Sequence, residues 1–138
     1  MTPMVVGELI GSRTLLRFLL GAGNVIAAAL LLFPFVGPGS FTLILKEAPS
    51  HVKIVAAILA VLCGNGVFLA RSIYGHSAPG WLAHWSLRVV NALGACFSLI
   101  ATYASFSIGA TRAGGVMGVV AIVFAAHAVL LPKTIGHN

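Results

Sequence analysis

The 138-residue chain is too apolar for an ordinary soluble domain: 59% of its residues are hydrophobic, only 7% are charged, and its mean hydropathy is +1.07, whereas about a quarter of a soluble domain is charged. It carries eight Lys and Arg residues against two acidic residues, an excess that would favour nucleic-acid binding in a soluble protein. Here these charges flank apolar segments, so we interpret them as determinants of membrane topology and expect no nucleic-acid partner.

The first predicted helix covers residues 15–36 and is long enough to cross a hydrocarbon core of about 30 Å. Arg13 precedes it and Arg17 lies in its first turn, and such positive charges before an apolar run are also typical of a secretory signal peptide. The apolar run is longer than a signal core and lacks a polar segment before a cleavage site, so we interpret it as a membrane span. Pro34 predicts that the helix ends or bends there. The apolar piece 41–45 that follows is predicted to lie at the membrane interface or to extend the first hairpin.

The second predicted helix covers residues 54–74, of which 54–70 are apolar. Ala56, Ala60 and Gly64 repeat every four residues, a spacing that places small side chains on one helix face and favours close packing against another helix. Trp81 lies in the gap before the next helix and Trp85 lies at the start of that helix, and Trp is a common anchor at a membrane boundary.

The third predicted helix, residues 85–108, has one face on which every residue is small or polar. We call this face the polar stripe; it consists of His84, Arg88, Asn91, Ala95, Ser98, Thr102 and Ser105. We favour its interpretation as a packing seam, because small residues and hydroxyls mediate helix association in lipid. The alternative is a water-lined pathway or ligand groove with His84 and Arg88 at its mouth.

The fourth predicted helix covers residues 114–131 and follows a gap of only five residues, 109–113. So short a connection makes the last two helices antiparallel neighbours. Gly114 and Gly118 form a GxxxG pair, and we predict that they and Gly64 are helix-packing positions.

A second group of polar residues is predicted near one membrane boundary, namely Arg17, Asn65, Arg71 and His127. We favour structural hydrogen bonding for this group, and the alternative is a basic pocket for an anionic headgroup, a quinone carbonyl or a haem propionate. Haem between two imidazoles would require His84 or His76 opposite His127, so no cofactor is the favoured expectation. We predict no metal site, since Cys63 and Cys96 are isolated and behave as small apolar residues.

The charges also predict the orientation of the helices, since cytoplasmic flanks are enriched in Lys and Arg. One side carries five of these residues (Arg13, Arg17, Arg71, Arg88 and Lys133) and the other carries three (Lys46, Lys53 and Arg112). We therefore expect an all-α integral membrane protein, a single bundle of four transmembrane helices with both termini in the cytoplasm. Its size and span count suit the inner membrane of a prokaryote.

Independent catalysis is not expected, because the chain has no Asp and its two acids, Glu8 and Glu47, lie outside the apolar segments. No catalytic triad or phosphate-binding loop is present in the sequence. The favoured hypothesis is a non-catalytic accessory or structural subunit of a larger membrane complex, in contact with lipid and with other subunits or itself. The alternatives are a small homo-oligomeric transporter or channel for a neutral or anionic solute, and a haem- or quinone-binding anchor of a redox complex.

Overall fold

The computed structural model describes residues 3–74 and 80–131, with side chains for 13–71 and 80–131. Four helices are long and apolar enough to cross a membrane: α1 (Pro3–Leu32), α3 (Pro49–Tyr74), α4 (Trp81–Ser107) and α5 (Thr111–Leu130). Two short elements, the 3₁₀ turn η1 (Phe33–Phe35) and α2 (Ser40–Glu47), lie between α1 and α3. For the described residues, the prediction of an all-helical chain with four long apolar helices is confirmed.

All four long helices begin before their predicted starts, because they continue past their apolar segments. α1 begins at Pro3, twelve residues before the predicted start, and ends at Leu32, where Pro34 enters the first turn of η1. Pro34 has no N–H to donate and so cannot continue the α-helix. α3 begins at Pro49, a proline in the first helical turn, where its missing N–H costs nothing.

The segment predicted at 41–45 is the helix α2, and none of its residues is buried. Gly39 begins it with a φ of +79°, and the Thr42 hydroxyl donates a hydrogen bond to the Gly39 carbonyl oxygen (2.8 Å). Phe35 contacts the rings of Phe41 and His51, with centroid distances of 6.2 and 6.3 Å. These ring contacts hold α2 against the start of α3.

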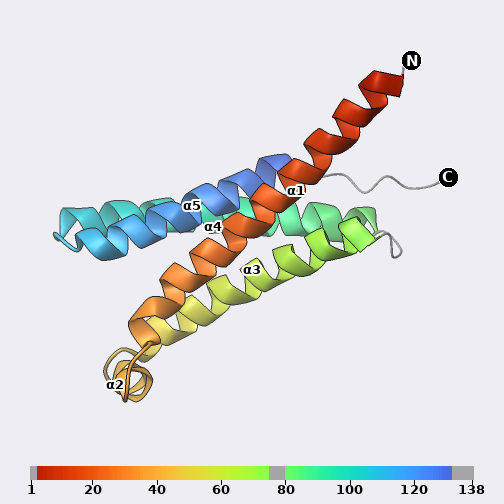
Figure 1. The fold of residues 1–138 in the computed structure, drawn as a ribbon. Coiled ribbons are helices and arrows are strands. Elements are labelled where there is room, and N and C mark those ends of the chain that lie inside the picture. Colours follow the sequence, from red (N-terminus) through yellow and green to blue (C-terminus); the bar gives the residue numbers. More distant parts are fainter. Residues whose placement is uncertain (1–2, 75–79, 132–138) are drawn as a thin grey trace.

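The four long helices form two antiparallel hairpins, α1 with α3 and α4 with α5 (Figure 1). The α4–α5 hairpin has the most extensive contact of any helix pair and is closed by a tight turn in which Gly109 has a φ of +76°. The two hairpins converge where α3 leads into α4 and diverge toward α2 and the α4–α5 turn. We call these the α3–α4 end and the α2 end.

The apolar core consists of two clusters of buried residues. The larger cluster joins all four long helices through Ala27, Leu31, Val55, Ile58, Leu62, Ala95, Val120, Val123 and Phe124. The smaller cluster lies toward the α3–α4 end and consists of Leu20, Phe68, Leu69 and Leu131. Large apolar residues elsewhere are exposed, among them Leu93, Ile100 and Ile122, as expected for helices whose solvent is lipid.

Candidate functional site

The polar stripe of α4 faces the other helices. His84, Asn91, Ala95 and Ser98 are buried, whereas Arg88, Thr102 and Ser105 are half-buried. The opposite face of the helix, with Val89, Leu93 and Ile100, is exposed. The spacing of four and three residues therefore brings the stripe residues onto the interior side of α4.

Asn65 and Asn91 form a reciprocal amide pair between α3 and α4. Asn65 Nδ2 donates to Asn91 Oδ1 (2.8 Å), and Asn91 Nδ2 donates to Asn65 Oδ1 (2.7 Å) and to the Leu87 carbonyl oxygen (2.7 Å). Both side chains are fully buried. Because an amide without partners is costly in apolar surroundings, this pair specifies how the first hairpin docks on the second.

His84 and Arg88 bind the carboxyl end of α5. His84 donates from Nε2 to the Leu131 carbonyl oxygen (3.2 Å), and Arg88 donates from Nε to the Ala128 carbonyl oxygen (2.6 Å). The Arg88 guanidinium also lies over the Trp85 ring, 5.3 Å from its centroid. The last carbonyls of a helix have no partner within the helix, so these two side chains cap α5.

His127 is fully buried on α5 and has one ring nitrogen in use. Its Nδ1 donates to the Val123 carbonyl oxygen (2.8 Å), one turn earlier on the same helix. Its Nε2 has no hydrogen-bond partner among the described residues. Since Nδ1 holds the proton of a neutral imidazole, Nε2 presents a free lone pair toward the interior.

The contacts between α4 and α5 give the level of His127 along the helices. Arg88 reaches Ala128, and the ring of Phe124 packs on Gly94. On α4, Asn91 lies midway between Arg88 and Gly94. It is therefore level with the part of α5 midway between Ala128 and Phe124, next to His127. The buried imidazole and the Asn65–Asn91 pair therefore occupy one layer of the molecule.

Three further interior side chains have polar atoms without a partner among the described residues. They are both amide atoms of Asn24, the hydroxyl of Ser98 and Nε of Arg17. Asn24 is 6% exposed and Ser98 is fully buried. Buried polar atoms are normally paired with protein or water, so these atoms mark a polar stretch of the interior. Asn24 was not among the predicted site residues, and the signal in the sequence is its position as a polar residue inside an apolar segment.

The second predicted group does not share one set of contacts. Asn65 bonds to Asn91, His127 bonds within its own helix, and Arg71 is exposed. Arg17 lies half-buried on α1. His76, the other residue considered for haem, and Lys133 lie outside the described residues. Among the described residues, no three His, Cys, Asp or Glu side chains are close enough to hold a metal ion, and Cys63 and Cys96 are exposed free thiols.

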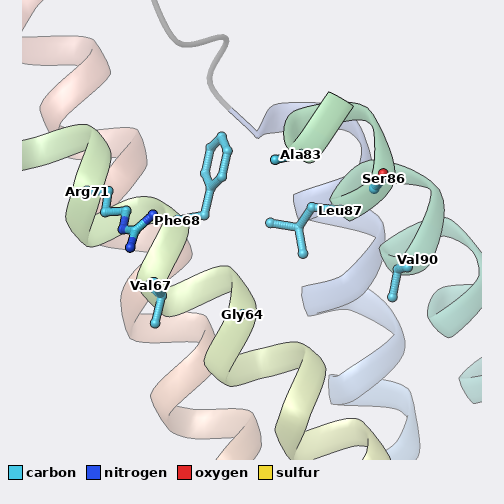
Figure 2. A pocket seen from close by; sticks show the side chains of 8 residues that line it. All are labelled: Gly64, Val67, Phe68, Arg71, Ala83, Ser86, Leu87 and Val90. Atoms are coloured by element: carbon cyan, nitrogen blue, oxygen red, sulfur yellow. The ribbon is translucent and has the colours of Figure 1, made fainter. Parts of the chain in front are cut away.

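A groove runs between α3 and α4 at the α3–α4 end (Figure 2). Its volume is about 300 Å³, and its walls are formed by Gly64, Val67, Phe68 and Arg71 of α3 and by Ala83, Ser86, Leu87 and Val90 of α4. Phe68 and Leu87 extend into the space between the helices. Arg71 and Ser86 are the two lining residues with polar side chains, so the groove is apolar with one cationic end.

The three predicted packing glycines lie at contacts between helices of this chain. A Cβ on Gly114 would lie 3.0 Å from the Phe106 ring, one on Gly118 would lie 3.8 Å from Thr102, and one on Gly64 would lie 3.8 Å from Leu87. Gly114 and Gly118 thus allow α5 to approach α4. Gly94 has the closest neighbour of the described glycines, since its Cβ would lie 2.5 Å from Phe124. Gly94 is not one of the predicted packing positions.

These features define a protein of four long apolar helices with a polar layer inside and an apolar groove on its surface. The chain matches no protein-family model, and comparisons with curated proteins and with solved structures find no similar protein.

Proposed function

We propose that this protein is a non-catalytic subunit of a larger assembly in the inner membrane of a prokaryote. Its four long helices form a transmembrane bundle with both termini on the cytoplasmic side. In this proposal its role is to hold other membrane subunits through contacts between helices. The chemistry of the assembly belongs to those partners.

The observation that carries the proposal is a face of small residues on α3 that the other helices of this chain cover only in part. Gly64 on this face lies near Leu87 of α4. Ala56 and Ala60, two turns and one turn closer to the α2 end, are exposed, since the hairpins diverge there (Figure 1). Small residues let helix backbones approach closely in lipid, so a helix of another subunit fits this face.

The internal contacts of the polar residues also favour a structural role. Asn65 and Asn91 bind each other, and His84 and Arg88 bind backbone carbonyls of α5. Side chains engaged in this way stabilise the arrangement of helices and have little capacity left for a substrate.

Native mass spectrometry of the protein extracted gently from its own membrane tests the proposal. We expect a complex that contains other membrane subunits. Photocrosslinking groups at Ala56 and Ala60 should capture the same partner, whereas one at Ile122, which is 71% exposed on α5, should capture it less. A preparation that contains the chain alone, at native expression level, would contradict the proposal. A defined homo-oligomer would instead favour transport.

A second candidate function is the transport of a small neutral or anionic solute by a homo-oligomer. The observation that favours it is the set of interior polar atoms without partners on Asn24, Ser98 and His127. Proteoliposomes would show it by stopped-flow light scattering with glycerol or urea gradients. An Asn24→Leu variant should abolish such flux while an Ile122→Leu variant keeps it. Ser98→Leu is a poorer test, because Ser98 is fully buried and the larger side chain would disturb packing.

A redox anchor that binds haem or quinone has less support. The free Nε2 of His127 suits a metal ligand, but Nε2 of His84 is bonded to the Leu131 carbonyl oxygen. The contacts of α4 with α5 also place the two imidazoles about one turn apart. Visible absorbance or extractable quinone in the native preparation tests this possibility.

A further inference from the structure

The groove between α3 and α4 is cationic at one end and apolar at the other. Arg71, in the last turn of α3, is exposed at one end, and Gly64 lies seven residues away, about 10 Å further along the helix. The walls between them are apolar except for the Ser86 hydroxyl. Figure 2 shows the space between the two helices with the side chains of both walls around it.

The position of the groove matches the boundary of a bilayer, if the chain spans the membrane as proposed above. Trp81 and Trp85 begin α4 at the same end of the molecule and are 74% and 46% exposed. Exposed Trp residues mark the headgroup level of a membrane. Arg71 is therefore at the height of the lipid phosphates, and Gly64 is at the height of the acyl chains.

The charge of the groove favours an anionic ligand. Arg71 supplies a guanidinium, which binds phosphate through two parallel hydrogen bonds. No carboxylate is among the lining residues, and Glu47, the last residue of α2, lies near the opposite end of α3. The cation thus has no acidic neighbour in the groove to neutralise it.

The length and lining of the groove suit an acyl chain. About 10 Å separate Arg71 from Gly64 along α3, and the walls between them are apolar except for the Ser86 hydroxyl. An acyl chain that lies along these walls has its headgroup phosphate at the level of Arg71. We propose that this groove binds one acyl chain of an anionic phospholipid, with the lipid phosphate on Arg71.

The two tryptophans of the chain, Trp81 and Trp85, report on this site by fluorescence. The full-length protein is reconstituted in vesicles with brominated phosphatidylglycerol or brominated phosphatidylcholine, whose bromines quench nearby Trp. Trp fluorescence of the wild type should be quenched to a given extent at a lower mole fraction of brominated phosphatidylglycerol than of brominated phosphatidylcholine. Arg71→Gln should lower this preference about fivefold, the effect of one Arg at a membrane surface. Arg13→Gln removes a charge from an exposed residue of α1 outside the groove and should leave the preference unchanged.

A second pair of variants tests the acyl-chain part of the site. Gly64→Leu fills the groove and should remove the preference, whereas Gly64→Ala should keep it, since a Cβ there would be in ordinary contact with Leu87 at 3.8 Å. Ala83→Leu on the opposite wall replaces Gly64→Leu if that variant does not fold.

Equal quenching by both lipids in the wild type would overturn the proposal. So would a preference that survives Arg71→Gln or the groove-filling variants, because it would then reflect general surface attraction. Absence of quenching by either lipid would contradict membrane insertion itself.

Discussion

At the scale of single residues, the amide pair between Asn65 and Asn91 is the most specific contact between the hairpins. Replacing Asn91 with Ala leaves the buried Asn65 amide without its partner. We expect a loss of about 1 kcal/mol in the free energy of unfolding, the usual size of a side-chain hydrogen bond between membrane helices. Unfolding in mixed micelles with increasing SDS measures this change.

The double variant Asn65→Ala/Asn91→Ala provides the control. It leaves no unpaired amide, so its loss should be smaller than the sum of the two single losses. Strict additivity would show that the reciprocal bonds do not contribute to stability.

Gly94 gives a second prediction at this scale, because it has no room for a side chain. In Gly94→Ala the new Cβ would overlap the ring of Phe124, which is only 1% exposed and cannot move freely. We expect destabilisation of about 1–3 kcal/mol, the cost of overpacking, in the same unfolding assay. Gly115→Ala is the matched control, since no atom lies within 4 Å of the Cβ position there. Rescue of Gly94→Ala by Phe124→Leu would confirm that the clash is local.

At the scale of the helices, the α4–α5 hairpin is the best-packed unit of the molecule. Its turn depends on Gly109, whose φ of +76° is strained for any residue with a Cβ. Gly109→Ala should therefore destabilise the hairpin by about 1 kcal/mol. Helicity and stability in detergent measure the effect, with Gly115→Ala again as the control. Equal stability of both variants would mean that the turn can adopt another geometry.

At the scale of the whole molecule, the distribution of charge predicts the orientation in the membrane. We expect a cysteine placed at Lys46 to react with an impermeant maleimide added to intact cells, and a cysteine at Arg13 to react only after the cells are opened. Both are made in a background without Cys63 and Cys96, which are exposed free thiols. The reverse labelling pattern would place both termini outside and would remove the cytoplasmic assignment.

The sequence by itself determined the number of long helices and the face of α4 that carries the polar stripe. Both follow from local patterns, because the length of an apolar run sets whether a helix can span a bilayer and the helical period assigns residues to one face. The ends of the helices were less predictable. Capping and turn chemistry, such as Pro34 after Leu32 and Pro49 at the start of α3, set them independently of hydropathy.

Only the tertiary structure decided which polar residues meet. Depth along the helices places Asn65 near several polar residues, and the structure shows that its partner is Asn91. His84 and Arg88 bind the end of α5. The groove beside Gly64 and the contact of Gly94 with Phe124 also appear only in three dimensions. The physical reason is that helical periodicity gives the face of each helix, whereas the rotation, height and crossing angle of two helices depend on the packing of all their side chains together.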